Sequence, residues 1–282
     1  MPEGAMVQGL LANAALIVAT MTVLWLIAVR IKDVSFIDAV WGGGMALLAL
    51  ASWFQLGEPG TRATLIMAMT VLWGARLGLH LFVRWRAHGE DPRYARMLGK
   101  AKERGNFAGA ALKAVFAPQA VLLFLTCLPA QLGILASPAP APLGLLAFAG
   151  LLLWSVGVFF EWVGDWQLSR FRADPGNKGK VLDRGLWKYT RHPNYFGDAC
   201  AWWGIWLVAA EAGWWIAAAS VIGPLFLTFT LTKWSGKPLL ERGMAKRRPE
   251  YAAYVERTSG FVPWPPKPAG GSLRRASSGR FS

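Results

Sequence analysis

The chain has 282 residues, of which 54% are hydrophobic and only 16% are Asp, Glu, Lys or Arg, whereas about 25% are charged in ordinary soluble domains. Long apolar runs account for this deficit, which excludes a soluble globular protein and predicts an all-α, polytopic membrane protein. The formal net charge of +14 does not predict nucleic-acid binding, because most basic residues lie in loops between apolar segments.

Seven apolar segments are about long enough to cross a bilayer. In chain order they cover residues 7–29, 36–54, 63–83, 114–135, 143–164, 197–211 and 213–232. The last two are short and are separated only by a turn near Glu211. A fold with six spans, one of them re-entrant, therefore stays open beside the prediction of seven.

Basic residues alternate between successive loops. Loops 84–113 and 165–196 carry eight and seven Lys or Arg, whereas loop 136–142 and the turn near Glu211 carry none. By the positive-inside rule, this alternation predicts an outside N-terminus and a cytoplasmic C-terminus. The polar loops that could hold chemistry would then face the cytoplasm.

The domain organisation follows from the same pattern. Residues 1–265 are expected to form a single integral-membrane domain. Residues 266–282 are rich in Pro, Gly, Ser and Arg, a composition typical of a disordered tail that binds anionic membrane lipids.

Several classes of active site lack their motifs. The chain contains no GxGxxG, GxxxxGK[ST], HExxH or GxSxG sequence. Its three histidines are too few and too scattered for a histidine-rich metal centre, so no metal site is predicted.

One polar stretch, residues 161–203, lies between two apolar segments. Glu161, Asp165 and Arg172 are spaced by four and seven residues, so on a helix they share one face. This face is suited to hydrogen bonding a polar ligand. A helix end at which arginines snorkel and pair with the two acids is the alternative.

The sequence TRHPNYFGD, residues 190–198, predicts a helix entrance. Asn194 is a favourable N-cap for a helix that starts near Tyr195. Arg191 and His192 then stand beside a helix N-terminus, which favours anions such as a pyrophosphate or a 2′-phosphate. The rings of Tyr189 and Tyr195 are suited to stack on a base or a nicotinamide. An ordinary cap flanked by basic residues is the alternative.

The segment 239–264 adds further charged and tyrosine residues. It is expected either to fold back over the same entrance or to lie as an amphipathic helix at the interface.

The stretch DWQLSRFRADPGNKGKVLDRGLWKYTRHPNYFGD (165–198), together with the tyrosine-containing C-terminal segment, resembles the steroid 5-alpha-reductase-like C-terminal domain family, in its uncharacterised bacterial branch. KDVSFIDAVWGGG (32–44), LWGARLGLHLFVRWRAHGEDPRY (72–94) and FAPQAVLLFLTCLP (116–129) also resemble that branch. The resemblance thus covers about residues 30–265.

The resemblance implies a multi-pass enzyme of the bacterial inner membrane that holds NADPH in a cytoplasm-facing cavity of its C-terminal half, residues 143–265. Residues 30–113 would form the substrate side. The positions that match the family's cofactor contacts are Asp165, Arg172, Asn194, Asp198 and Tyr254. Arg191, His192 and Tyr195 lie inside the same motif, and Tyr189 lies beside it.

The implied reaction is that of an oxidoreductase acting on CH–CH groups. Hydride would pass from NADPH to a conjugated C=C bond of a lipophilic, steroid-like or isoprenoid-like enone that arrives from the bilayer. The family's carbonyl-polarising tyrosine position holds Leu81 here. Asp38, an acid within an apolar span, and Tyr94, the one tyrosine of the first half, are the candidate proton donors to the enolate oxygen.

Two other classes stay open. A membrane methyltransferase of the isoprenylcysteine carboxyl type shares the RHPxY entrance and would bind S-adenosylmethionine. The DWQLSRFR run at 165–172 favours the reductase, because its additional cations suit a phosphate-bearing cofactor. A transporter or lipid-binding scaffold is third, since no inverted repeat is present. The sequence predicts no oligomeric state.

Overall fold

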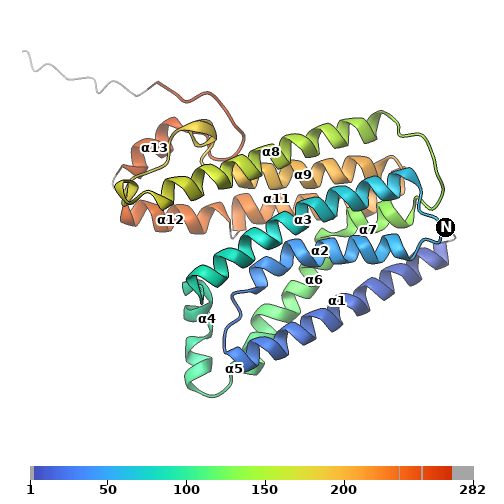
Figure 1. Ribbon diagram of the computed structural model, residues 1–282, viewed down its shortest axis with the longest axis horizontal. Coiled ribbons are helices and arrows are strands. Elements are labelled where there is room, and N and C mark those ends of the chain that lie inside the picture. The colour runs from blue at the N-terminus through green and yellow to red at the C-terminus, as the bar shows by residue number, and fades with distance from the viewer. Residues whose placement is uncertain (1–2, 235, 249, 269–282) are drawn as a thin grey trace, which may run out of the picture. The chain divides into compact units, whose positions relative to one another are not determined.

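The computed structural model describes residues 3–234, 236–248 and 250–268, and within these ranges every regular element is a helix (Figure 1). The α-helices are α1 (Glu3–Ile31), α2 (Ile37–Phe54), α3 (Thr61–His88), α4 (Pro92–Glu103), α5 (Phe107–Ala111), α6 (Ala117–Thr126), α7 (Leu128–Leu135), α8 (Leu145–Ala173), α9 (Pro193–Ala210), α10 (Trp214–Ser220), α11 (Ile222–Phe229), α12 (Lys237–Arg247) and α13 (Tyr251–Arg257). The short elements are the π-helices η1 (Leu112–Phe116) and η4 (Thr230–Trp234) and the 3-10 helices η2 (Pro175–Asn177) and η3 (Gly185–Lys188).

The all-helical membrane architecture is confirmed at this level. Among the described residues, six helical segments are long and apolar enough to cross a membrane: Gly4–Ile31, Ile37–Phe54, Thr61–His88, Phe107–Thr126, Leu145–Ala173 and Trp214–Met244. The segment predicted at 197–211 is a helix, α9, but it is not among the six. The count of seven spans and the orientation in the membrane stay predictions.

Two predicted spans have different limits in the structure. The segment expected over 114–135 is divided at Cys127, which separates α6 from α7. The segment expected over 143–164 continues to Ala173 as α8. The polar residues Glu161, Asp165 and Arg172 therefore lie on the same helix as the apolar run that precedes them.

The chain forms two compact units, and each contains two separate parts of the sequence. The first unit comprises Met1–Val158 and Asp198–Thr230, and the second comprises Phe159–Gly197 and Leu231–Ser282. Helices α8 and α9 both begin in one unit and end in the other. Residues 269–282, which include most of the predicted basic tail, lie outside the described residues.

In the first unit, α2 and α3 lie side by side (Figure 1) and touch through their backbones. A Cβ atom on Gly42 would lie 2.4 Å from the Gly74 carbonyl oxygen, and one on Gly74 would lie 2.3 Å from the Gly42 oxygen. Gly78 continues the contact one turn further along α3. Small residues at this spacing let membrane helices approach closely, so the helix pair is built for direct backbone packing.

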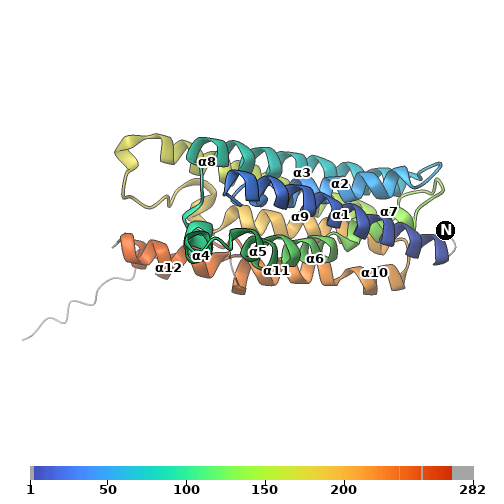
Figure 2. The ribbon, with the colours of Figure 1, turned by 90° about the horizontal axis from the view of Figure 1, so that it is seen from below.

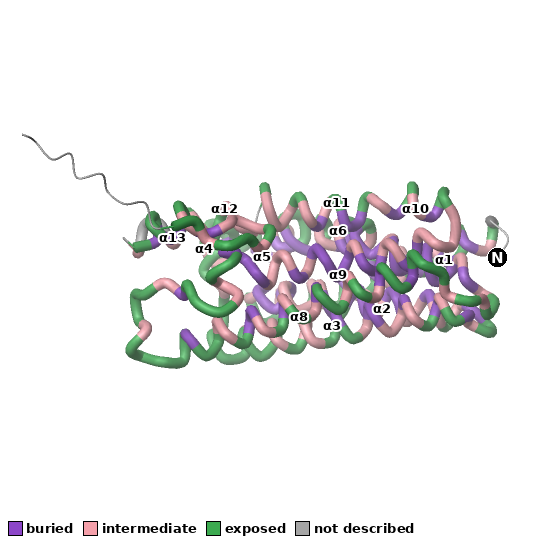
Figure 3. The backbone as a smooth tube through the Cα atoms, turned by 90° about the horizontal axis from the view of Figure 1, so that it is seen from above, coloured by how far each residue is buried: buried purple, intermediate pink, exposed green. Residues whose placement is uncertain are grey.

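The segment from α5 to α6 runs beside α1 in both views (Figures 1 and 2). Trp25 Nε1 on α1 donates to the Ala108 carbonyl on α5 at 2.9 Å. The exposed face of α1 is apolar: Leu11 is 64% exposed and Val18 is 57% exposed. Exposed and buried residues alternate along this helix (Figure 3), and large apolar side chains on its outer face are suited to lipid contact.

Candidate functional site

In the second unit, the entrance to α9 is held by an ion-paired cluster. Arg191 Nε donates to Glu241 Oε1 at 2.9 Å, and His192 Nε2 lies 3.1 Å from the same oxygen. Arg191 and His192 are both buried. The anion that contacts these two predicted cofactor residues is therefore a carboxylate of the chain itself, supplied by α12.

The C-terminal segment folds back over this entrance, as one of the two alternatives for residues 239–264 predicted. Arg191 Nη1 donates to the carbonyl oxygens of Val255, at 3.2 Å, and Thr258. The Arg191 backbone N–H donates to Ser259 O at 2.9 Å, and Thr190 Oγ1 donates to Phe261 O at 2.8 Å. These bonds use most of the N–H groups of Arg191. Arg191 therefore holds the C-terminal segment against the entrance to α9.

Tyr254 is also tied to the entrance. It is buried, and its hydroxyl donates to the Trp187 carbonyl at 2.6 Å. Trp187 Nε1 in turn donates to the Gly164 carbonyl of α8 at 3.0 Å. Tyr254 thereby connects α13, the loop before α9 and the end of α8 within the second unit.

Asn194 has a different role from the predicted N-cap. Helix α9 begins at Pro193, a favourable residue for the first helical position, so Asn194 lies inside the first turn. Its Nδ2 donates to Asp165 Oδ1 on α8 at 3.1 Å. The structure thus joins two predicted cofactor residues, but by an interaction between helices.

Glu161, Asp165 and Arg172, which were expected to share one helix face, differ in burial. Glu161 and Asp165 are buried, whereas Arg172 is exposed near the C-terminus of α8. Burial of two carboxyl groups in an apolar protein is costly. Arg172 contributes to a separate surface cavity instead.

This surface cavity, which we call the turn cavity, lies where α8 ends and has a volume of about 250 Å³. Its lining residues are Phe171, Arg172, Asp174, Pro175, Asn177, Lys178, Gly179 and Arg248. Three of them are cations and one is a carboxylate. Lys178 and Arg248 were not among the predicted site residues, although Lys178 lies in the stretch 165–198 that carries the family resemblance.

The remaining predicted cofactor residues, Tyr189, Tyr195 and Asp198, do not line the turn cavity. The Tyr195 ring stacks on His192 with centroids 5.3 Å apart and an angle of 6°. Tyr189 is exposed, with the Lys188 ammonium over its ring at 5.9 Å. Asp198 belongs to the first unit, where its Oδ1 accepts from Trp73 Nε1 at 3.3 Å.

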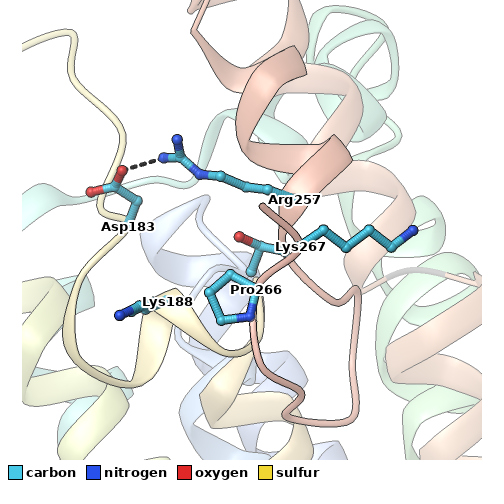
Figure 4. Close-up of a pocket in the computed structure, with 6 residues that line it drawn as sticks. Asp183, Lys188, Arg257, Pro266 and Lys267 are labelled. Carbon is cyan, nitrogen blue, oxygen red and sulfur yellow. Dashed lines mark hydrogen bonds and ion pairs between the residues drawn. The ribbon is translucent and has the colours of Figure 1, made fainter. Parts of the chain in front are cut away.

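A second surface cavity, of about 260 Å³, lies between the loop before α9 and the C-terminal segment of the same unit (Figure 4). Asp183 and Arg257 form an ion pair at its edge. Figure 4 shows the Lys188 and Lys267 side chains extending in opposite directions. The cations of this cavity therefore do not converge on one point.

In the first unit, the structure brings together the two predicted catalytic residues. The Tyr94 hydroxyl donates to Asp38 Oδ1 at 2.7 Å. Arg93 Nη2 donates to Asp38 Oδ2 at 2.6 Å, and Arg84 Nη2 lies 3.7 Å from that oxygen. One carboxylate thus orients a phenol while two guanidinium groups balance its charge.

Gln119 on α6 completes this cluster. Its side chain hydrogen-bonds Tyr94, and its Oε1 accepts from Trp41 Nε1 at 2.6 Å. Burial and the adjacent Asp38 carboxylate raise the pKa of the Tyr94 hydroxyl above its ordinary value, so the phenol stays protonated at neutral pH. The sequence signal for Gln119 is an isolated polar residue in an otherwise apolar run.

Burial also shifts the pKa of three side chains in the second unit. It lowers the pKa of His192 below its ordinary value, although Glu241 acts in the opposite direction. It raises the pKa of Tyr251 to about 12 and the pKa of Tyr254 above its ordinary value. At neutral pH the imidazole is therefore mainly neutral and both phenols are protonated.

Comparisons with known proteins place the chain in one family. The model described as "Protein of unknown function (DUF1295)" matches residues 24–258, so the chain belongs to that family. No curated protein and no solved structure matches the chain.

Proposed function

We propose that this member of the DUF1295 family is an NADPH-dependent membrane reductase that acts on the conjugated C=C bond of a lipophilic enone, of steroid-like or isoprenoid-like chemistry. The observation that carries the proposal is the hydrogen-bonded Tyr94–Asp38 pair with Arg93 beside it. A protonated phenol held by a carboxylate is suited to donate to a carbonyl oxygen on which charge develops. Methyl transfer has no comparable need for such a donor.

The cofactor is assigned to the second unit on the chemistry of its side chains. Residues 159–197 and 231–268 contain fifteen Lys and Arg against seven Asp and Glu. Arg172, Lys178 and Arg248 suit the phosphates of NADPH, and Asp165 with Asn194 suits its polar groups. Bound NADPH would supply the hydride.

The chain's own residues supply the remaining functions. Tyr94 hydrogen-bonds the substrate carbonyl, while Asp38 and Gln119 hold its hydroxyl in position. Arg93 balances the charge of Asp38, so that this carboxylate releases the phenol hydrogen more readily. The substrate enters from the bilayer, and the orientation with the cofactor residues in the cytoplasm is part of the proposal.

Ligand-dependent stability tests this function. Protein purified in detergent is heated with NADPH, NADH or S-adenosylmethionine, because a ligand that binds the native state at about 100 times its Kd adds about 2.7 kcal/mol of stability. NADPH is expected to raise the unfolding temperature. Asn194→Ala should reduce that rise, whereas Asn106→Ala, at the start of α5 in the first unit, should leave it unchanged.

The second candidate is an S-adenosylmethionine-dependent methyltransferase. It is favoured by the RHPxY entrance, at which Arg191 and His192 contact a glutamate of the segment that folds back over it. Stabilisation by S-adenosylmethionine alone, with no response to either nicotinamide nucleotide, would reject the reductase and support this class.

A further inference from the structure

Four side chains from three helices of the first unit form a chain of hydrogen bonds around Tyr94. Trp41 Nε1 on α2 donates to Gln119 Oε1 on α6 at 2.6 Å. The Gln119 side chain also hydrogen-bonds Tyr94 on α4, and the Tyr94 hydroxyl donates to Asp38 Oδ1 at 2.7 Å. Asp38 precedes Trp41 by three residues on α2, so both residues lie on the same face of that helix.

Trp41 fixes the direction of these hydrogen bonds. An indole N–H is a donor only, so the oxygen of the Gln119 amide must face Trp41. The NH2 group of the same amide then faces Tyr94. A phenol has a single hydrogen, and Tyr94 donates this hydrogen to Asp38. The Tyr94 oxygen therefore accepts a hydrogen bond from Gln119.

The orientation of the Gln119 amide decides where the Tyr94 hydrogen goes. Burial and the Asp38 carboxylate raise the pKa of Tyr94, whereas the hydrogen bond from Gln119 lowers it, as expected of an N–H group that stabilises a phenolate. In the reversed orientation, the Gln119 oxygen would compete with Asp38 for the Tyr94 hydrogen. The observed orientation keeps this hydrogen for Asp38 or for a ligand.

We propose that Trp41 is a positioning residue that acts on Tyr94 through Gln119. It holds the Gln119 amide so that the Tyr94 oxygen accepts from the amide and the Tyr94 hydrogen is presented to Asp38 or to an acceptor oxygen of a ligand. Trp41 needs no contact with the ligand for this role.

The catalytic consequence rests on the proposed function. In the reductase, the Tyr94 O–H bond breaks, an O–H bond forms on the enolate oxygen, and the negative charge passes to the phenol oxygen. The N–H group of Gln119 stabilises that charge, because it already donates to this oxygen before the proton is transferred.

Raman spectroscopy of the full chain in detergent tests the orientation without a substrate. The relative intensity of the two bands of the tyrosine doublet reports whether a phenol donates, accepts or does both. The wild-type spectrum minus that of Tyr94→Phe isolates Tyr94 among the five tyrosines. We expect the pattern of a phenol that both donates and accepts. The pattern of a phenol that only donates would overturn the proposal, even if every other variant failed to fold.

Trp41→Phe removes the indole donor and keeps an aromatic ring. Its Tyr94 doublet, isolated against Trp41→Phe combined with Tyr94→Phe, is expected to shift towards the pattern of a phenol that only donates. Gln119→Met should give the same shift. Trp53→Phe is the matched control, because Trp53 is also half-buried on α2 and its Nε1 donates to Thr64 Oγ1 at 3.2 Å, outside this cluster. An unchanged doublet in Trp41→Phe overturns the role of Trp41.

Steady-state kinetics with an enone test the catalytic consequence. Trp41→Phe is expected to lower kcat about tenfold, the contribution of roughly one hydrogen bond, and to leave the KM for NADPH unchanged. Trp53→Phe should turn over as the wild type does. Full turnover by Trp41→Phe overturns the positioning role and leaves the reductase proposal standing. If the wild type reduces no enone, the reductase proposal fails, and the Raman doublet alone decides the role of Trp41.

Discussion

The hydroxyl of Tyr94 has a single hydrogen, and in this structure it is donated to Asp38. In the proposed reaction, a substrate carbonyl must compete with this carboxylate for that hydrogen. Arg93 weakens Asp38 as a hydrogen-bond acceptor for this hydrogen, because it donates to the other Asp38 oxygen at 2.6 Å. In the proposed reductase, the reactivity of the phenol therefore depends on the Asp38 carboxylate and on the guanidinium groups of Arg84 and Arg93 beside it.

Replacing Tyr94 by Phe removes this donor and is expected to lower kcat by about 10²- to 10⁴-fold, the contribution typical of a positioned acid. Nucleotide binding should be unchanged, since Tyr94 is not among the proposed cofactor residues. Steady-state kinetics with an enone and nucleotide titration of the same sample measure both effects. Full turnover by Tyr94→Phe would exclude the assigned role.

The lowered pKa of His192 predicts that the protein unfolds more readily in acid. Because burial lowers its pKa in the folded state, the unfolded chain binds a proton more readily. Stability is therefore present above the unfolded pKa of about 6.5 and is lost as the pH falls below it. The groups that face the imidazole are Glu241, Arg191 and Lys237.

Thermal unfolding of the wild type and His192→Gln between pH 7.5 and 5 tests this linkage. The wild-type unfolding temperature should fall with pH, and the variant should show a flatter profile. His88→Gln is the control, because His88 is exposed at the end of α3. Parallel profiles for wild type and His192→Gln would contradict the prediction.

At the residue scale, the sequence indicates which side chains belong to a site more readily than it indicates which residues they contact. Asp38 and Tyr94 are distinctive in the sequence, one as an acid in an apolar run and the other as a lone tyrosine, and the structure joins them. Glu241 and Gln119 were not assigned to the site. Their roles depend on contacts across 49 and 25 or more positions of the chain, and one sequence contains no signal for such pairing.

At the scale of elements, the α2–α3 contact tolerates no side chain at Gly42. An alanine methyl there would lie 2.4 Å from a backbone oxygen, so Gly42→Ala is expected to cost about 1–3 kcal/mol, as overpacking does. Gly43→Ala is a matched control, since nothing lies within 4 Å of its added methyl. That variant should be neutral or more stable by up to about 1 kcal/mol.

Thermal unfolding of the two variants in the same detergent compares them directly. Equal unfolding temperatures would show that α2 and α3 do not pack through their backbones as described.

The helices themselves were largely predictable, and their interruptions less so. The predicted segment 114–135 contains Pro118 and Pro129. Proline lacks an N–H and clashes with the carbonyl four residues earlier. The π-helix η1 ends at Phe116, two residues before Pro118, and the break at Cys127 lies two residues before Pro129. Hydropathy averages over a window and does not register such local breaks, although the prolines mark them.

At the scale of the whole molecule, an even or odd number of spans determines whether the two termini lie on the same side of the membrane. Six spans place both termini on one side, whereas the predicted opposite sides require α9 as a seventh. Gly57 lies between α2 and α3, and Gly99 lies on α4, between the spans Thr61–His88 and Phe107–Thr126; an added Cβ would meet open space at both. The two native cysteines are buried.

We expect an impermeant thiol reagent to label Gly57→Cys in intact cells and Gly99→Cys only after permeabilisation, because the charge pattern predicts that residues 84–113 face the cytoplasm. The reversed labelling pattern would contradict the predicted orientation.

The second unit combines residues 159–197 with residues from 231 onward, and this has a consequence for biosynthesis. Ribosomes add about 5–20 residues per second. Thr258, Ser259 and Phe261 are therefore synthesised several seconds after the residues at the entrance to α9. Until then the donors of Arg191 lack the carbonyls that later accept from them. A premature stop codon between 231 and 257 would thus release a chain whose first unit is fully synthesised and whose Arg191 stays exposed to quality-control proteases.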